Sequence, residues 1–564
     1  MTRTRRGLAF AAVLACCGAC AGAATGTPAG GAAPIRGQSF RLDDRVVIPS
    51  MTMVRAVAVS DRYAFLATPL ALGIYDRVFS QWLPPFTRID GWPLAAVNAM
   101  MADPADSRSV WVATNDGVFH YRAGDDQIAH AMAGQPVAAN IYVDGADPAA
   151  GLIVQSASGV YRVSPTGFTQ PYTGPTSSVR PPARPVTARA RYTPQTVASV
   201  YAQFHSLQDY ERLLTRDESM RAWPVIAAGV APAQNEVWLG TAGGGAFKVD
   251  PVFNRGEAEP FGMLGDGATA VAAGPGGVWI GGSGRIGGGR DGLTYADNEM
   301  RHWRWIDGGV ASPFAGVRIT AISAVGRSVW VGTDHGLVRV DAQTGAIAQR
   351  WDDTRGLPSA VVLAVAAAAD GAWVATTHGV VFVHETAIGK GDTGVDAPVL
   401  ENFPAQALLL RRDTLWIGSN AGVLVLPPGS PTPRQLRVAD REQRVSQSVV
   451  ALASADSIVA FATAGGEVLR VNARTGDLQD TLSIVNPARA GRIHALAMDG
   501  STVWIAGDAG VVIANRATRA ERFLPAFGEL PGEAFGVALT PAYAWIAARD
   551  GVVRLRRLDD GSVR

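Results

Sequence analysis

The stretch SVWVGTDHGLVRV, residues 328–340, decides the fold class. Its first half is apolar and rich in residues that favour strands, and its second half alternates apolar and polar side chains. A small polar turn with Gly336 separates the halves, six residues after Trp330. Glycine suits a turn residue with positive φ, so the stretch predicts a β-hairpin.

The same unit recurs along the chain. Close copies occupy residues 109–121, 236–249, 371–383, 414–426, 502–514 and 543–555, and residues 277–295 hold one with a longer turn. Weaker copies occupy residues 63–75, 151–163 and 457–471, which makes eleven units. The tryptophan position returns every 43 residues or so, with one gap of 85 residues. A fixed period of this length indicates a repeat architecture.

Each period has room for four short strands. Between residues 318 and 351, the segments RITAISA, SVWVGT, GLVRVD and AIAQRW are separated by turn residues. Four-stranded units at this period predict an all-β fold, a β-propeller array in which the apolar tryptophan packs between neighbouring blades.

Eleven blades exceed the usual four to eight of one ring. Two tandem propellers are therefore expected, residues 46–300 and residues 301–564, and one oversized ring is the alternative.

Two segments carry a family resemblance. VWVGTDHGLVRVDAQTG (329–345), followed by WDDTRGLPSAVVLAVA (351–366), resembles the two-component-regulator propeller repeat. In that family such units form ligand-sensing propellers outside the cytoplasm. The resemblance implies a sensor-like fold over about residues 50 to 560, without the kinase part.

The N-terminus resembles an export signal. Three arginines precede a short apolar run in residues 1–20. Val13-Leu14-Ala15-Cys16 resembles the lipobox of bacterial lipoproteins, which implies lipidation at Cys16, and ordinary cleavage near Ala23 is the alternative. Residues 21–45 predict a flexible tether. The protein is thus expected in the periplasm or at the outer membrane, touching a membrane through the lipid only.

Net charge and cysteine content limit the classes of partner and the cross-links that we expect. The formal net charge is +1, so no general field attracts nucleic acid. All three cysteines lie in the first 20 residues, so the fold is expected to need no disulfide.

Two segments break the repeat. Residues 168–225 form an insertion with a one-sided apolar stripe from Val197 to Leu214, which predicts a helix, either packed on the propeller rim or serving as a lid. The glycine-rich residues 281–292 predict a lengthened hairpin turn, from which Arg285 and Arg290 could reach an anionic group.

Catalytic motifs are missing from the sequence. The eight histidines show no zinc-ligand spacing, no nucleophile elbow is present, and no cofactor is expected. His335 and His378, in equivalent turns of adjacent units, are the best catalytic candidates. We therefore expect a non-catalytic scaffold for an envelope protein, carbohydrate or peptide. A propeller lyase or hydrolase and an outer-membrane assembly factor are the alternatives.

Ligand binding is expected on one propeller face. The turn between the second and third strands opens on the same face as the connection to the next blade. The residues expected there are Asn115, Asp116, Arg285, Arg290, Asp334, His335, Arg355, His378, Asn420, Asp508, Arg549 and Asp550.

Overall fold

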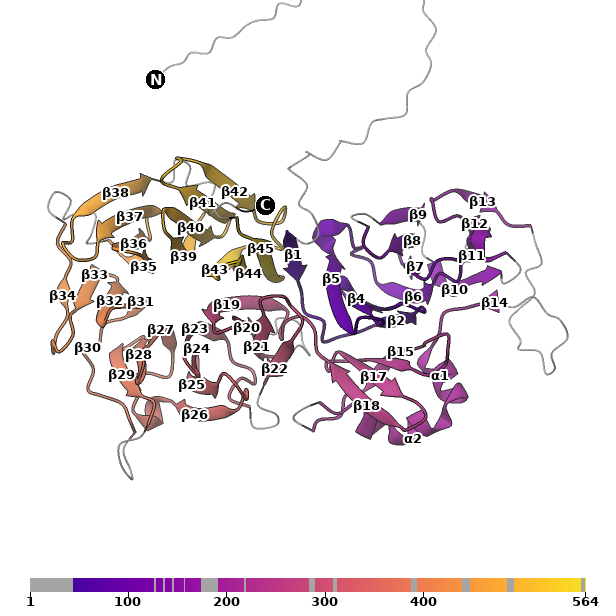
Figure 1. Cartoon of the computed structure of the whole chain (residues 1–564), viewed down its shortest axis with the longest axis horizontal. Coiled ribbons are helices and arrows are strands. Elements are labelled where there is room, and N and C mark those ends of the chain that lie inside the picture. Colours follow the sequence, from indigo (N-terminus) through magenta and orange to yellow (C-terminus); the bar gives the residue numbers. More distant parts are fainter. Residues whose placement is uncertain are drawn as a thin grey trace, which may run out of the picture. The chain divides into compact units, whose positions relative to one another are not determined.

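A computed structural model describes residues 44–125, 128–134, 137–144, 147–156, 158–173, 191–217, 220–283, 290–307, 312–386, 393–438, 447–483, 491–558 and 563. These residues form eleven antiparallel sheets, ten with four strands and one with five, and two short α-helices (Figure 1). The all-β propeller-blade prediction is confirmed. Export signal, Cys16 and most of the tether lie outside the described residues.

Seven sheets close into one ring, which we call the seven-bladed ring. The inner strands contact one another in chain order, and the last, β43, contacts the first, β19. The strands of the seven sheets, inner to outer, are β19 (Gly267–Gly274), β20 (Gly277–Ser283), β21 (Gly292–Asp297) and β22 (Trp303–Ile306); β23 (Ile319–Val325), β24 (Ser328–Thr333), β25 (Gly336–Asp341) and β26 (Ile347–Trp351); β27 (Val362–Ala367), β28 (Gly371–Thr376), β29 (Gly379–His384) and β30 (Leu400–Glu401); β31 (Ala405–Arg411), β32 (Thr414–Ser419), β33 (Gly422–Leu426) and β34 (Arg434–Gln435); β35 (Val449–Ala455), β36 (Ile458–Thr463), β37 (Glu467–Asn472) and β38 (Leu478–Ser483); β39 (Ile493–Asp499), β40 (Thr502–Gly507), β41 (Gly510–Asn515) and β42 (Glu521–Pro525); and β43 (Ala534–Leu539), β44 (Tyr543–Ala548), β45 (Gly551–Arg556) and β1 (Arg45–Ile48).

The strand β1 completes the last blade from the other end of the described chain. It pairs antiparallel with β45, from Arg45 opposite Leu555 to Ile48 opposite Val552. Three strands from the C-terminal end and one from the N-terminal end therefore share a sheet, which joins the two ends of the fold.

Four further sheets form the four-sheet unit. Its strands are β2 (Ala56–Val59), β3 (Tyr63–Ala67), β4 (Ala71–Asp76) and β5 (Gln81–Thr87); β6 (Val97–Ala102), β7 (Ser109–Thr114), β8 (Gly117–Arg122) and β9 (Ala129–Ala133); β10 (Val137–Asp144), β11 (Leu152–Ser156), β12 (Gly159–Val163) and β13 (Thr169–Pro171), with β14 (Arg191–Tyr192) added beside β10; and β15 (Val225–Val230), β16 (Val237–Thr241), β17 (Ala246–Asp250) and β18 (Arg255–Glu259). The inner strand β2 contacts both β6 and β15, and β6 contacts β10.

The expected division of the chain is wrong in position. A boundary between residues 300 and 301 would cut the sheet β19–β22, whose inner strand contacts β23 and β43 of the seven-bladed ring. The eleven units share one marker, so the sequence did not show that the unit at residues 277–295 closes a ring with the six units after it.

The helices cover one sheet of the four-sheet unit. Helix α1 (Val197–Gln203) and helix α2 (His205–Leu214) follow β14, and α1 contacts β15. Val200 and Leu207 are buried against Leu239 and Phe247 of that sheet. The predicted helix exists, and it packs on the sheet. The start of the insertion is corrected, because β13 is the outer strand of its blade.

The repeated tryptophans lie on the second strands and fill the core. Trp111, Trp238, Trp330, Trp504 and Trp545 are completely buried. Trp330 stacks on Trp351 at 5.4 Å between ring centroids and shares a cluster with Val362 and Val365 of the next blade. Inter-blade packing of these indoles is what the repeat predicted.

Candidate functional site

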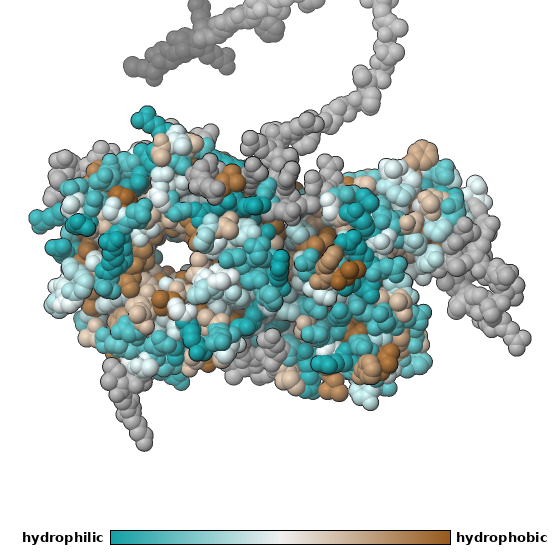
Figure 2. All heavy atoms as spheres, viewed as in Figure 1, coloured by the Kyte–Doolittle hydropathy of each residue, from teal (hydrophilic) through white to brown (hydrophobic). Residues whose placement is uncertain are grey.

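A β-bulge interrupts every inner strand of the seven-bladed ring near its first residue. In each sheet the register to the second strand shifts around the second or third residue of the inner strand. The extra residues are Thr269, Thr320, Leu363, Gln406, Val450, His494 and Phe535. Bulges re-aim a side chain and are common beside functional sites. They lie at the strand ends that meet the turns between second and third strands, and Figure 2 shows this ring open along its axis.

Three of the turn residues expected to bind ligand contact bulge residues of their own blade. The amide of Gln406 donates to Asn420 at 3.0 Å, and His494 Nε2 lies 2.5 Å from Asp508 Oδ1. In the four-sheet unit, the amide of Asn98 donates to Asn115 at 2.8 Å. The turn and the start of the inner strand thus form one polar rim.

Other expected residues lie in the same turns but form separate local contacts. Asp334 accepts from the backbone N–H of Arg318 at 3.0 Å and lies 2.9 Å from Nδ1 of His335. Nδ1 of His378 lies 3.1 Å from the hydroxyl of Thr377.

The remaining expected residues are distributed over several places. Asp116 is exposed in the turn between β7 and β8. Arg355 ends the short 3₁₀ helix Asp353–Arg355 and donates to the carbonyl oxygen of Arg350 at 3.3 Å. Arg285 lies outside the described residues.

Arg290 lies in a buried cluster of charged and aromatic side chains. Its guanidinium is buried, donates to Asp307 at 2.9 Å through Nε, and lies over the rings of Trp223 and Trp305 at 4.8 and 5.4 Å. Burial lowers the pKa of Arg290, and Asp307 opposes that effect. Arg290 thus belongs to an ion-pair cluster with Asp217, Arg221 and Asp307.

The rim is richest where the last two blades of the ring meet. The ring of Phe535 lies 5.4 Å from the ring of His494, and Arg549 pairs with Glu533. This places a histidine–aspartate pair, an aromatic side chain and an ion pair on one stretch of the rim.

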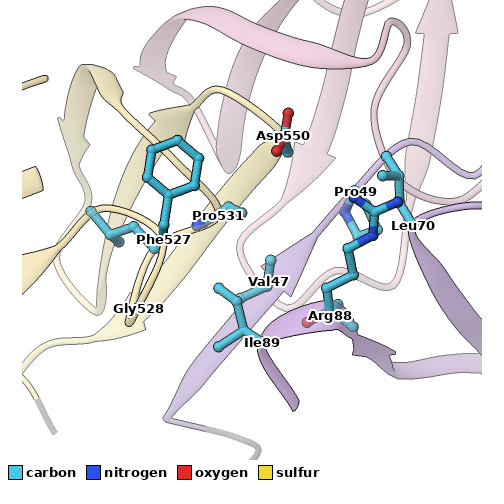
Figure 3. A pocket seen from close by; sticks show the side chains of 11 residues that line it. Val47, Pro49, Leu70, Arg88, Ile89, Phe527, Gly528, Pro531 and Asp550 are labelled. Atoms are coloured by element: carbon cyan, nitrogen blue, oxygen red, sulfur yellow. The ribbon is translucent and has the colours of Figure 1, made fainter. Parts of the chain in front are cut away.

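A pocket of about 340 Å³ opens beside this stretch (Figure 3). It lies between the loop that joins β42 to β43 and the segment that joins β5 to β6. The described residues lining it are Val47, Pro49, Leu70, Thr87, Arg88, Ile89, Phe527, Gly528, Leu530, Pro531 and Asp550. The walls are mainly apolar, and Arg88 and Asp550 add one charge of each sign.

Phe527 stands exposed at the edge of this pocket. Its side chain is 68% exposed, and its backbone has a φ of 60°, a region that bulky residues rarely occupy. The backbone N–H groups of Gly528, Glu529 and Leu530 all point to the carbonyl oxygen of Pro525 at 3.1 to 3.4 Å, which fixes the turn. A strained and exposed aromatic residue held by its surroundings is typical of a functional site.

Both charged residues are positioned by backbone contacts. Arg88 donates to the carbonyl oxygen of Pro69 at 3.2 Å, and the backbone N–H of Asp550 donates to Pro531 at 3.1 Å. In Figure 3, Arg88 lies on the opposite side of the pocket from Phe527, and Asp550 lies on the same side as Phe527, on the turn between β44 and β45. A ligand with an apolar face and hydrogen-bonding groups would find partners for both.

Of these pocket residues, the sequence analysis named Asp550 and did not name Phe527 or Arg88. The available signal was PAFGELPG, residues 525–532, whose prolines and glycines interrupt a strand-rich region. The bulges left no signal in the sequence.

Within the described residues, no group of three or more acidic, histidine or cysteine side chains is placed to hold a metal ion. None of the helices in that part of the chain is long and apolar enough to cross a membrane.

Comparison with known proteins found likeness in fold to solved bacterial proteins. The structure is similar to PorZ, an essential surface component of the type-IX secretion system of Porphyromonas gingivalis, with 12% identity and a TM-score of 0.50. The match covers 91% of this chain and 87% of PorZ. The extracellular domain of BT4673 of B. thetaiotaomicron, described as a one-component and as a hybrid two-component system, matches with 14% identity and a TM-score of 0.41, covering 91% and 72% of the two chains. The sequence matches no protein-family model and no curated protein. At these identities the likeness to solved structures shows the fold alone: this chain has the β-propeller architecture found in bacterial surface proteins.

Proposed function

We propose that this protein is a sensor-like binding scaffold of the bacterial cell envelope, which binds a carbohydrate or peptide fragment in the pocket beside Phe527. The observation that carries the proposal is the pocket itself, whose lining combines an exposed aromatic held at positive φ with one charge of each sign. Ligand pockets combine apolar walls with a few placed polar groups, and this pocket has that composition.

The chemistry of the pocket favours an uncharged or zwitterionic ligand. Arg88 and Asp550 cancel in net charge, so neither a polyanion nor a polycation gains from the pair as a whole. The ring of Phe527 offers a face for the apolar side of a sugar or for an aliphatic side chain.

Two observations also support the proposed location in the cell envelope. The signal-like residues 1–20 and the likeness in fold to a bacterial surface protein both favour a place outside the cytoplasm. Lipidation at Cys16 is part of the proposal. A Cys16→Ser variant should lose labelling by a fatty-acid probe, and continued labelling would assign the lipid elsewhere.

The binding proposal is tested by a thermal-shift screen with neutral oligosaccharides and short peptides. A ligand that stabilises the wild type should lose its effect on Phe527→Ala and on Arg88→Ala while both variants remain folded. Leu94→Ala is the matched control, because Leu94 is 77% exposed and does not line the pocket. Equal shifts in all variants would remove the site from this pocket.

The histidine–aspartate pair favours one alternative, a propeller enzyme. His494 and Asp508 lie on the rim with the Nε2 atom of the histidine at the carboxylate. Turnover of an oligosaccharide that disappears in His494→Ala would establish that alternative in place of simple binding.

A further inference from the structure

The hairpin turns between third and fourth strands differ between the two halves of the fold. In the four-sheet unit, Asp76-Arg-Val78-Phe79-Ser80 and Asp250-Pro-Val252-Phe253-Asn254 are nearly the same turn. The four apolar side chains, Val78, Phe79, Val252 and Phe253, are 65%, 66%, 74% and 80% exposed. A third turn of that unit exposes Phe168 by 68%. We call these the phenylalanine turns.

The geometry of the turn does not require apolar residues. Asp76 Oδ1 accepts from the N–H groups of Val78 and Phe79 at 3.0 and 3.2 Å. Asp341 Oδ1 accepts from Gln343 and Thr344 at 3.0 and 2.8 Å in the equivalent turn of the seven-bladed ring.

Two more turns of the seven-bladed ring have the same geometry and carry no exposed Val-Phe pair. Asn472 caps Arg474 and Thr475, and Asn515 caps Ala517 and Thr518, in the same way. Three turns of the seven-bladed ring are thus polar where two turns of the four-sheet unit carry Val-Phe. Packing does not explain the difference, because these side chains are exposed.

The two Val-Phe turns belong to neighbouring sheets. The guanidinium of Arg77 donates to Glu236 of the next sheet at 2.7 Å, and Tyr75 packs on Trp238 at 4.8 Å between ring centroids. Lys248, two residues before Asp250, lies 3.6 Å from the same Glu236. Both turns join third to fourth strands, so they open on one face of the unit, opposite the turns between second and third strands.

We infer that the phenylalanine turns insert into the surface of a lipid bilayer. Separate protruding side chains, each mostly surrounded by solvent, fit a fluid surface that needs no matching pockets, whereas protein interfaces bury flatter and closely packed patches. The aspartate caps satisfy the turn N–H groups, which lowers the cost of placing them in an apolar medium.

The chain between Cys16 and the fold is long enough for the phenylalanine turns to reach the bilayer. This step rests on the proposed lipid anchor at Cys16. The 28 residues from Cys16 to Asp44 can extend up to about 95 Å, so an anchored protein reaches the bilayer with any face. Phenylalanine turns at the surface would fix its orientation, with the opposite, second-to-third-strand face of the unit away from the lipid.

The test measures vesicle binding without any acyl chain. The chain from residue 21 onward, which lacks the export signal and all three cysteines, is mixed with vesicles of phosphatidylethanolamine and phosphatidylglycerol, and bound protein is separated by flotation. We expect binding that falls by about a hundredfold when Val78, Phe79, Val252 and Phe253 are all changed to Ser.

The control is Leu94→Ser, which removes an equally exposed apolar side chain from the connection between β5 and β6. It should bind vesicles like its parent. No vesicle binding by the parent, or equal binding by the four-residue variant, would overturn the inference and assign these turns to a protein partner. Fatty-acid labelling at Cys16 is measured separately, so failure of the anchor and failure of the turns are distinguishable.

Discussion

Truncation of Trp330 tests the inter-blade packing at a single position. The indole is completely buried and contacts Trp351 and residues of the next blade. A side chain of about 200 Å² at about 25 cal/mol per Å² corresponds to about 5 kcal/mol of transfer free energy. Because alanine keeps part of that area, Trp330→Ala should lower the free energy of unfolding by about 4 kcal/mol.

Two phenylalanine variants separate packing from hydrogen bonding. Within the described residues, Nε1 of Trp330 has no hydrogen-bond partner, so Trp330→Phe should cost less than about 2 kcal/mol. Trp238 occupies the same repeat position, and its Nε1 donates to Glu236 at 2.5 Å. Trp238→Phe should cost about 1.5 to 3 kcal/mol more than Trp330→Phe, since the bond to a carboxylate is lost.

Guanidinium unfolding followed by near-ultraviolet circular dichroism measures both effects. The seven-bladed ring and the four-sheet unit can unfold in separate steps, so each variant is assigned to the step whose midpoint it moves. A Trp330→Ala protein with unchanged midpoints, or one that loses ligand binding while keeping its stability, would refute the packing account.

Burial raises the pKa of Glu259 to about 7, so wild-type stability should fall as pH rises from about 4.5 to about 7, by at most about 3 kcal/mol. Glu259→Gln should remove that slope, measured as unfolding midpoint against pH, while Glu521→Gln, an exposed change on β42 of another sheet, should keep it. Gly336 has a φ of 124°, and a Cβ there would lie 2.3 Å from the carbonyl oxygen of Trp351. Gly336→Ala should therefore lower the unfolding midpoint more than Gly326→Ala, where the φ is 55° and the space is open; equal midpoints would contradict it.

The blades could be predicted from the repeat because the same packing and turn interactions stabilise each blade. An indole on the second strand and a glycine at the following turn leave a marker in every strong copy, and the structure gives each of the eleven units its own sheet. Even Ile153 and Val459, where the tryptophan is replaced, lie buried on second strands. The pattern of apolar and turn residues within each repeat is thus enough to predict the sheet that the repeat forms.

Ring closure was less predictable because it depends on distant partners. β1 pairs with β45 across almost the whole chain, and RVVI carries no sign of its partner. The candidate site was hard to predict for the same reason, because it is formed by residues that are distant in sequence. Arg88 and Phe527 are far apart in sequence and meet only through the fold, and Arg290 looked accessible in a glycine-rich turn although Asp307 and two indoles enclose it.

Hydrogen exchange with and without the ligand found by the thermal-shift screen tests the central claim most directly. If the pocket beside Phe527 holds the ligand, amides in residues 526–532 and in residues 87–90 should exchange more slowly when it is bound, although these segments belong to different sheets. Slower exchange confined to the turns around Asp334 and His378, or to none of these segments, would contradict the account.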